Sequence, residues 1–307
     1  MVYDLAIIGG GPAGVAAGVY ASRKRLKTVF ITKDFLGQSS VSDGIENWIG
    51  TVRIPGTELS KNLENHLKAY AGDILDIRDG ELAERVVKIP EGFSVKTGKA
   101  EYRTKTVLIT AGSHRRKLDV PGAKEYDNKG LTYCATCDGP LFADKDVVVV
   151  GGGNAAFETA AQLLAYCKSV TLLNRSDVLR ADEVTVKKVL SNPKMNAVMN
   201  AIPTEIKGDK FVSGIIFEDA KTKERTDLRT DGIFVEIGLL PNTDFVKDIL
   251  TLNSYGQIIA DPRNQRASVL GIWAAGDCTD GLYHQNNIAA GDAVKALEDI
   301  YSYLHLQ

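Results

Sequence analysis

The sequence has little cysteine, and what it has does not form a disulfide scaffold. Only four cysteines occur among 307 residues, and just two of them, Cys134 and Cys137, are close in the sequence. Secreted disulfide-rich domains use far more, so this usage favours a reducing cytoplasm and one working dithiol. Zinc requires four ligands, and the sequence offers neither a second cysteine pair nor ligand spacing among its four histidines. We therefore predict no metal site.

Long apolar runs and a strong excess of one charge are also missing. No apolar run approaches the ~18 residues that span a bilayer. Asp4, with a strand pattern directly behind it, argues against a signal peptide. The formal net charge is −2, which gives no indication of a nucleic acid or an anionic membrane as partner. We interpret the short basic tract His114-Arg115-Arg116-Lys117 as solvated surface or as part of a domain hinge.

Two glycine-rich loops stand out against this background. The apolar run 5–8 leads into the first glycine loop, Gly9-Gly10-Gly11-Pro12-Ala13-Gly14. The run 146–150 leads into the second glycine loop, Gly151-Gly152-Gly153-Asn154-Ala155-Ala156. Glycine permits a tight turn, close approach of a pyrophosphate and packing of strand against helix, and the helix N-terminus presents N–H groups to phosphate. Because both loops follow a predicted strand and open a predicted helix, the sequence predicts two nucleotide sites.

The same strand–helix–strand order surrounds both loops. Around the first loop we predict strands over 5–8 and 27–31 and a helix over 13–20. Around the second we predict strands over 146–150 and 169–173 and a helix over 154–166. Units of this kind build doubly wound parallel sheets. The sequence therefore predicts an α/β fold with two doubly wound, Rossmann-like nucleotide-binding domains.

Two segments mark where the chain passes between these domains. Residues 110–113 end one stretch of predicted strands, and Gly and Pro interrupt the pattern at 238–242. The helix predicted over 288–304 leaves too few residues for a third domain, so we assign it to the first. We expect one domain at 1–113 and 243–307, with the second, at 114–242, inserted into it.

The residues after the second strand of each unit indicate which nucleotide it would take. In the first unit they are Thr32 and, displaced, Asp34, which is either a ribose ligand or an exposed loop residue. In the second they are Arg175 and Arg180, with no carboxylate placed to hold a ribose 2′-hydroxyl. Arginine there favours NADPH over NADH. The alternative is that both arginines are ordinary solvated side chains.

The cysteine pair lies just ahead of the second strand–helix–strand unit. Two cysteines separated by two residues can close a small disulfide whose redox change needs little backbone motion. Asp138 follows Cys137 directly and could give or take the proton that thiol exchange requires. Cys167 and Cys278 stand alone in the sequence and are typical of buried small apolar residues. We therefore predict a redox dithiol at Cys134 and Cys137.

Taken together, these stretches resemble the bacterial low-molecular-weight thioredoxin reductase family. The matching stretches span nearly the whole chain in the family's order: 9–14, Glu46-Asn47-Trp48, Cys134-Ala135-Thr136-Cys137-Asp138-Gly139, 151–154 and Gly276-Asp277. The cysteine segment is the specific signal, since many flavoproteins share the glycine loops. The resemblance implies FAD in the first domain, a nicotinamide nucleotide in the inserted one, a homodimer, and a rotation of one domain against the other during turnover.

The resemblance also implies roles for particular residues. Gln38 and Asn47 would lie at the flavin, Asp277 at its ribityl chain, and His284-Gln285-Asn286 beside its ring system. Cys137 would contact the flavin, and Cys134 would attack the disulfide of the protein substrate. The cofactor residues expected in the first domain are Gly9, Gly11, Pro12, Ala13, Gly14, Thr32, Asp34, Gln38, Asn47, Ala111, Gly112, Gly276, Asp277, His284, Gln285 and Asn286. Those expected in the second are Gly151, Gly153, Asn154, Ala155, Arg175 and Arg180.

The sequence departs from the family's pattern at several positions. The usual His-Arg-Arg phosphate cluster is Asn174-Arg175-Ser176 here, Ser39-Ser40 follows Gln38, and Glu236 is unusual in its strand. Residues 234–242 and 276–279 look closer to the reductase half of the alkyl hydroperoxide reductase flavoprotein. That relative carries a thioredoxin-like domain ahead of its flavin domain. Since this chain starts at the flavin strand, we expect any such carrier to be a separate protein.

The prediction is a cytoplasmic oxidoreductase of the thioredoxin-disulfide reductase (NADPH) type. Electrons would pass from NADPH to FAD, then to Cys134 and Cys137, then to thioredoxin or a similar small redox protein. One alternative is the same dithiol reductase fed by NADH or reduced ferredoxin and serving a peroxiredoxin-type carrier. Another is a redox-inactive FAD-binding module, which would have no need of the cysteine pair.

Overall fold

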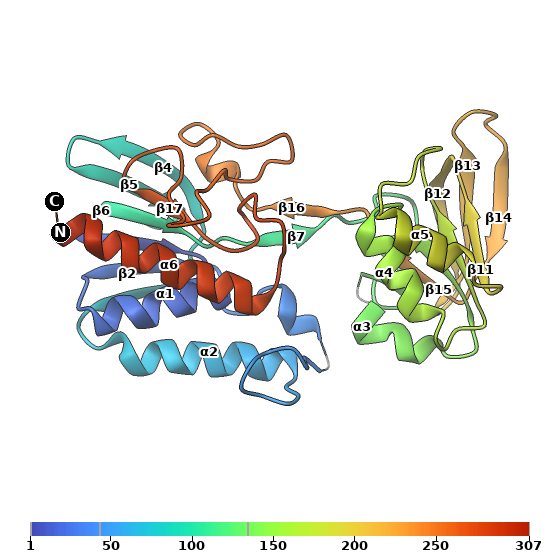
Figure 1. The fold of residues 1–307 in the computed structure, drawn as a ribbon, viewed down its shortest axis with the longest axis horizontal. Helices are drawn as coiled ribbons and strands as arrows, with labels where there is room; N and C mark the ends of the chain where they lie inside the picture. The colour runs from blue at the N-terminus through green and yellow to red at the C-terminus, as the bar shows by residue number, and fades with distance from the viewer. Residues whose placement is uncertain (1, 43, 134, 307) are drawn as a thin grey trace. The chain divides into compact units, whose positions relative to one another are not determined.

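The computed structural model of the chain describes residues 2–42, 44–133 and 135–306. It consists of two compact units, each of which is described by itself (Figure 1). Unit 1 comprises residues 1–114 and 240–307, so both ends of the chain belong to it, and unit 2 comprises residues 115–239. The chain passes between them twice, at the strands β7 (Ser113–Arg115) and β16 (Leu239–Pro241), which pair with each other.

Unit 1 is built on a seven-stranded sheet in which six strands follow the order β3-β2-β1-β6-β5-β4 and the seventh, β17, pairs with β6. Its parallel strands are β1 (Val2–Ile8), β2 (Thr28–Thr32), β3 (Leu75–Asp79), β6 (Glu101–Ile109) and β17 (Ile272–Ala274). Two antiparallel strands, β4 (Ala83–Ile89) and β5 (Gly92–Thr97), extend the sheet beyond β6. The helices are α1 (Pro12–Arg23), α2 (Gly56–Ala71) and α6 (Asn286–His305), with short 3₁₀ turns η1 (Gln38–Val41) and η3 (Asp244–Val246).

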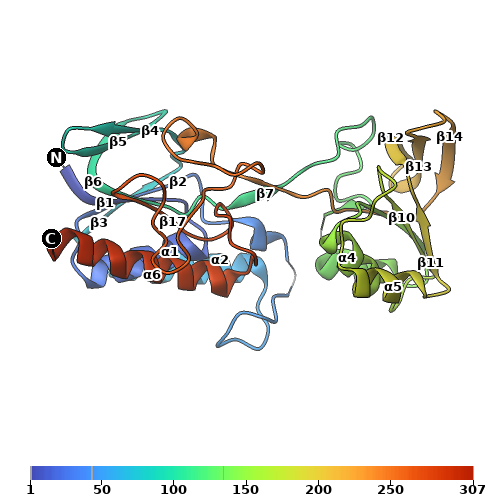
Figure 2. The ribbon, with the colours of Figure 1, turned by 45° about the horizontal axis from the view of Figure 1, so that its top comes forward.

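The apolar run of β1 is continuous because both faces of its sheet are covered. Leu5 and Ile7 face one core cluster, shared with residues of α1 and α6, whereas Ala6 and Ile8 face another. Helix α1 contacts both α2 and α6 (Figure 2). Small residues make this packing possible: a Cβ on Gly18 would stand 2.4 Å from Leu67 Cδ1.

Unit 2 repeats the doubly wound pattern on a smaller scale. Its five-stranded parallel sheet has the order β11-β10-β9-β15-β8. The strands are β8 (Leu131–Thr132), β9 (Asp146–Val150), β10 (Ser169–Leu173), β11 (Met195–Val198) and β15 (Gly232–Val235). An antiparallel sheet of β12 (Ala201–Gly208), β13 (Val212–Asp219) and β14 (Arg225–Arg229) accompanies it. The helical segments are α3 (Ala135–Asp138), η2 (Gly139–Phe142), α4 (Asn154–Leu163) and α5 (Glu183–Leu190).

The predicted α/β class with two Rossmann-like domains is confirmed, but two predicted helix ends were wrong. Helix α1 runs to Arg23, three residues beyond the predicted end at 20. Helix α4 ends at Leu163, three residues before the predicted end at 166. The backbone N–H of Cys167 still bonds to the Leu163 carbonyl at 2.8 Å, but the chain there has already turned towards β10. Among the residues that the structure describes, no helix is both long and apolar enough to cross a membrane.

Candidate functional site

A cavity of about 910 Å³ opens in unit 1 where β1, β2 and β6 end. Cofactor pockets commonly have volumes of about 300–1,000 Å³ and lie beyond the carboxyl ends of parallel strands. Twelve predicted cofactor residues line it: Gly9, Gly11, Pro12, Ala13, Thr32, Asp34, Gln38, Ala111, Gly112, Gly276, Asp277 and Asn286. The structure thus brings segments that are far apart in the sequence to one cavity.

The first glycine loop packs tightly on one side and is open on the other. Gly9 has φ +120°, and a Cβ there would stand 2.2 Å from the Thr110 carbonyl oxygen. A Cβ on Gly14 would stand 1.8 Å from the Gly9 oxygen, so Gly14 packs loop against helix and does not line the cavity. A Cβ on Gly11 would meet nothing within 4 Å, and Gly11 caps α1 without a side-chain hydrogen bond. The N–H groups of the first turn of α1 therefore remain available to an anion.

A polar network links residues that line the cavity. The Gln38 amide donates to Ser113 Oγ at 3.0 Å and to Asp277 Oδ2 at 3.4 Å. Ser39 Oγ donates to Asn286 Oδ1 at 2.9 Å. Burial raises the pKa of Asp277, and the charge of His284 opposes that rise. The network joins η1, the start of β7, the 276–277 turn and the start of α6.

Besides Gly14, three predicted cofactor residues of the first domain lie outside the cavity lining: Asn47, His284 and Gln285. Asn47 Nδ2 donates to Gln285 Oε1 at 3.0 Å, and Asn287 Nδ2 donates to the Asn47 carbonyl at 2.6 Å. His284 Nε2 is buried and has no hydrogen-bond partner among the residues that the structure describes. A buried ring nitrogen without a partner is costly, so this atom is a candidate for contact with a bound group.

Glu81 also lines the cavity and was missed by the sequence analysis. It follows β3, and its N–H bonds to the Thr32 carbonyl at 3.0 Å. Its buried carboxylate accepts hydrogen bonds from Thr97 Oγ1 at 2.7 Å and from the Tyr102 hydroxyl at 3.0 Å. Burial, followed by the bond to Glu81, raises the pKa of Tyr102 to about 12. No local motif marks Glu81, because pairing of β3 with β2 is what brings it to Thr32.

The predicted ribose ligand Asp34 lines the cavity but is exposed. Its carboxylate accepts a hydrogen bond from the Leu36 N–H at 3.0 Å, and its carbonyl accepts one from Thr32 Oγ1 at 2.5 Å. Asp34 therefore shapes the turn after β2 at the rim of the cavity.

The second glycine loop, in unit 2, is bonded more heavily to its own surroundings. Gly151 has φ +143°, and a Cβ there would stand 2.2 Å from the Glu236 carbonyl oxygen. The Gly152 carbonyl accepts from the Arg180 N–H at 2.8 Å. Asn154 Oδ1 accepts from the Asp182 N–H at 2.8 Å. A Cβ on Gly153 would meet nothing within 4 Å, so one edge of the loop stays open, and Ala155 is exposed beside it.

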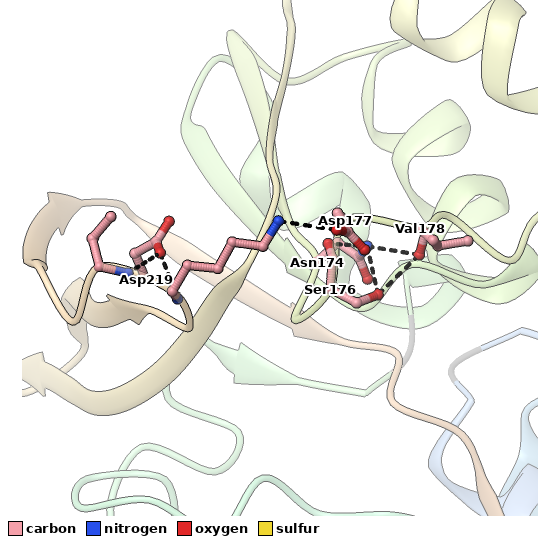
Figure 3. A network of polar contacts seen from close by, with 7 residues as sticks. Asn174, Ser176, Asp177, Val178 and Asp219 are labelled. Carbon is pink, nitrogen blue, oxygen red and sulfur yellow. Dashed lines mark hydrogen bonds and ion pairs between the residues drawn. The ribbon is translucent and has the colours of Figure 1, made fainter.

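The loop after β10 is held together by Asn174 (Figure 3). Asn174 is 5% exposed, and its amide donates to the carbonyls of Ser176 at 2.9 Å and Val178 at 3.0 Å. Asp177 pairs with Lys221 Nζ at 3.0 Å. Arg175 and Arg180 are not buried, and within the described part of the chain neither forms an ion pair. Asn174 thus serves the loop, and the two arginines are the cations available to an anion.

The structure does not describe the two thiols of the predicted dithiol. Cys134 lies outside the described residues, and so does the side chain of Cys137. Asp138 ends α3, and its carboxylate accepts a hydrogen bond from Thr132 Oγ1. Cys167 and Cys278 are fully buried thiols, as predicted, and burial raises the pKa of each to about 11.

Comparison with known proteins agrees with this arrangement. The family model described as pyridine nucleotide-disulphide oxidoreductase matches residues 3–293. A Bacillus subtilis protein named NADH dehydrogenase is 39% identical over 302 residues, covering 98% of this chain and 58% of the relative. The F component of alkyl hydroperoxide reductase from Pseudomonas putida is 40% identical over 306 residues, with coverage of 98% and 58%. The chain therefore spans 58% of the length of these curated relatives.

Solved structures show the same likeness over the whole chain. Thioredoxin reductase from Giardia duodenalis matches with TM-score 0.80 and 32% identity, covering 99% of each chain. Thioredoxin reductase from Lactococcus lactis matches with TM-score 0.77 and 33% identity, covering 99% of this chain and 100% of that one. The predicted resemblance to thioredoxin reductases is confirmed. The chain belongs to the pyridine nucleotide-disulphide oxidoreductase family.

Proposed function

We propose that the chain is a flavin-dependent disulfide reductase that draws electrons from NADPH and delivers them through Cys134 and Cys137 to thioredoxin or a similar small redox protein. The observation that carries the proposal is the unit 1 cavity, where an open glycine loop at a helix N-terminus meets the Gln38–Asp277 network. The names of the structural relatives, which are thioredoxin reductases, support the choice of substrate class.

The residues around the cavity fit FAD. Gly11 and the N-terminus of α1 offer free N–H groups to a pyrophosphate. The buried Nε2 of His284, which has no partner in the described part of the chain, and the carboxylate of Asp277 provide polar contacts for the remainder of the cofactor. Bound FAD would supply the hydride-accepting redox chemistry that no side chain offers. Gln38, held between Ser113 and Asp277, would orient polar groups against it.

Unit 2 fits a nicotinamide nucleotide. Its sheet reverses direction of winding between β9 and β15, which is where doubly wound sheets bind their ligands. The open Gly153 and the N-terminus of α4 lie at the end of β9. Arg175 and Arg180 form no ion pair within the described residues, so both guanidinium groups are available to bind a 2′-phosphate. These features support NADPH as the donor.

The chain's own thiols would carry out the exchange with the partner. The Cys134 thiolate attacks one sulfur of the partner's disulfide, which forms a mixed disulfide and releases the other sulfur as a thiolate. Cys137 then attacks Cys134, so the partner leaves as a dithiol and the Cys134–Cys137 disulfide forms. Asp138, held by Thr132, is placed to exchange the proton that accompanies this step. The cysteine usage and the resemblance support a cytoplasmic homodimer as the working form.

A second candidate keeps the dithiol but changes the donor and the carrier. Because Asn174 is bonded within its own loop, the cluster Asn174-Arg175-Ser176 offers a 2′-phosphate one cation, Arg175, with Arg180 as the second from outside it; this weakens the preference for NADPH over NADH. One relative is named NADH dehydrogenase and another is a component of alkyl hydroperoxide reductase. These names support NADH as the donor and a peroxiredoxin-type carrier as the acceptor in the second candidate. A ferredoxin-flavin thioredoxin reductase from Clostridium acetobutylicum, 27% identical with TM-score 0.53, supports ferredoxin less strongly.

Anaerobic titration of the FAD-loaded protein tests the proposal. NADPH, NADH and reduced ferredoxin are added in parallel while flavin absorbance is followed, and oxidised thioredoxin is then supplied. We expect NADPH to bleach the flavin and thioredoxin to restore its colour. The flavin of the Cys134→Ser variant should still bleach, but this variant should no longer pass electrons to thioredoxin. Bleaching by NADH alone selects the second candidate, and transfer retained in Cys134→Ser contradicts the role of that thiol.

A further inference from the structure

The basic tract 114–117 contributes more than a solvated surface. Arg115 Nη1 donates a hydrogen bond to the carbonyl of Tyr133. The Leu118 N–H donates to the Tyr133 hydroxyl at 3.2 Å, and Lys117 Nζ lies 5.5 Å from the centroid of the Tyr133 ring. Residues 115–118 thus hold one tyrosine by its carbonyl, hydroxyl and ring. All of these residues belong to unit 2.

A buried carboxylate holds Arg115 in place. Glu236 follows β15, and its side chain is only 11% exposed. Both of its oxygens lie 3.3 Å from Arg115 Nη1, and Oε1 also accepts from Thr159 Oγ1 at 3.0 Å. A buried carboxylate requires such partners, because loss of Arg115 would leave its charge uncompensated and loss of Thr159 would leave one oxygen without that donor. Burial raises the pKa of Glu236, and Arg115 opposes that rise.

The carbonyl that Arg115 holds belongs to the peptide bond that joins Tyr133 to Cys134. We propose that Arg115, fixed by Glu236, is a positioning residue for the dithiol: it anchors the carbonyl of Tyr133, the residue directly before Cys134 in the sequence, and brings a cation to that carbonyl. A cation beside a cysteine favours its thiolate, which is the attacking form. This inference rests on the proposed function, in which Cys134 is the attacking thiol.

Other charged groups also face this part of unit 2. Glu158, exposed on α4, acts on Glu236 and raises its pKa further. Asp138 lies at the end of α3, bonded to Thr132, and both carboxylates work against a thiolate when ionised. Lys117 is a second cation, but its ammonium pairs with Asp127 and lies over the Tyr133 ring. Arg115 is the cation bonded to the Tyr133 carbonyl itself. Its removal should therefore slow the reaction of Cys134 near neutral pH.

The test measures the reactivity of Cys134 directly. The FAD-loaded full-length Cys137→Ser protein, which cannot close the disulfide, is alkylated with iodoacetamide at about pH 5.5–9, and modification of Cys134 is followed by peptide mass spectrometry. Cys167 and Cys278 are fully buried and should react slowly. Arg115→Met should slow alkylation near pH 7 about fivefold or more and move the pH–rate profile to higher pH. Arg115→Lys should recover most of the rate.

The neighbouring Arg116 supplies a matched control. It is exposed, and within the described residues it forms no ion pair, so Arg116→Met should leave the profile unchanged. The midpoint of thermal unfolding shows whether each variant is folded. If Arg115→Met does not fold, Arg115→Gln should give the same slowing, since it keeps a donor for the Tyr133 carbonyl but loses the charge.

Equal profiles for the Arg115→Met and Arg116→Met variants would overturn the inference. So would a folded Arg115→Lys protein that reacts no faster than Arg115→Met, because charge would then not be the cause. The alkylation requires neither a nicotinamide donor nor a protein acceptor. Failure of every donor to reduce the flavin would therefore count against the proposed function and leave this measurement intact.

Discussion

The two glycine loops share a sequence pattern, but their surroundings differ. The first loop faces a cavity of about 910 Å³ with a polar network among its lining residues, and a buried histidine nitrogen of the same unit lacks a partner among the described residues. Around the second loop, Asn154 bonds to Asp182 and Asn174 bonds within its own turn, while two arginines stay available. The first environment suits a cofactor that stays bound, and the second suits a nucleotide that comes and goes.

The largest effect should come from adding a methyl group to the first glycine of each loop. Gly9 and Gly151 have positive φ, and a Cβ on either would stand 2.2 Å from a backbone carbonyl oxygen. Gly9→Ala should destabilise unit 1 by more than about 3 kcal/mol and yield protein without flavin. Gly151→Ala should keep its flavin but lose reduction by NADPH. Flavin absorbance and thermal unfolding measure both effects.

Gly291→Ala is the control for these variants. Gly291 lies within α6, and a Cβ there would meet nothing within 4 Å, so the change should leave flavin content and stability unimpaired. Loss of flavin in Gly151→Ala, or a full flavin complement in Gly9→Ala, would contradict the assignment of the flavin to the first loop and of the nicotinamide nucleotide to the second.

Removing the carboxylate of the unit 1 network should weaken flavin binding. Asp277→Ala takes away the group that accepts from Gln38, and we expect FAD affinity to fall about 10- to 100-fold. Fluorescence titration of the flavin-free protein with FAD measures this change. Asp73→Asn alters an exposed carboxylate of the same unit and should have no effect. Equal affinities for both variants would place the flavin elsewhere.

Removing the two arginines of unit 2 should act on one nucleotide only. The double variant Arg175→Ala/Arg180→Ala should raise the KM for NADPH about tenfold and leave the KM for NADH unchanged, because only NADPH carries a 2′-phosphate. Arg225→Ala, at an exposed arginine of the same unit, is the control. An equal rise for both nucleotides would mean that the arginines do not read the phosphate.

The smallest predicted effect concerns Glu236 and depends on pH. Because burial raises the pKa of Glu236, the folded protein holds its proton more tightly than the unfolded chain does. That contribution to stability is present at low pH and is lost as pH rises. Glu236→Gln does not titrate, so its unfolding midpoint should match the parent near pH 4 and exceed it by about 1–3 °C at pH 8. If the difference in unfolding midpoint between Glu236→Gln and the parent shrinks as pH rises, the pKa of Glu236 is lowered rather than raised.

Local patterns predicted most of the fold, and pairing of distant segments supplied what they missed. Strand β1 and helices α1 and α6 follow directly from apolar periodicity and glycine placement. The antiparallel strands β12 to β14 are not predicted by local patterns, since their partners lie across turns and the register of β12 against β13 is interrupted twice. The cavity-lining role of Glu81 and the Arg115–Glu236 pair depend on sheet order, which no local motif contains.

The central claim is that electrons from a nicotinamide nucleotide leave the protein through Cys134 and Cys137. Its most direct test is alkylation mass spectrometry of the FAD-loaded protein before and after anaerobic addition of NADPH. We predict two newly labelled thiols, both on the peptide that contains Cys134 and Cys137, only after NADPH is added. Flavin bleaching without any gain of label on that peptide would contradict the account.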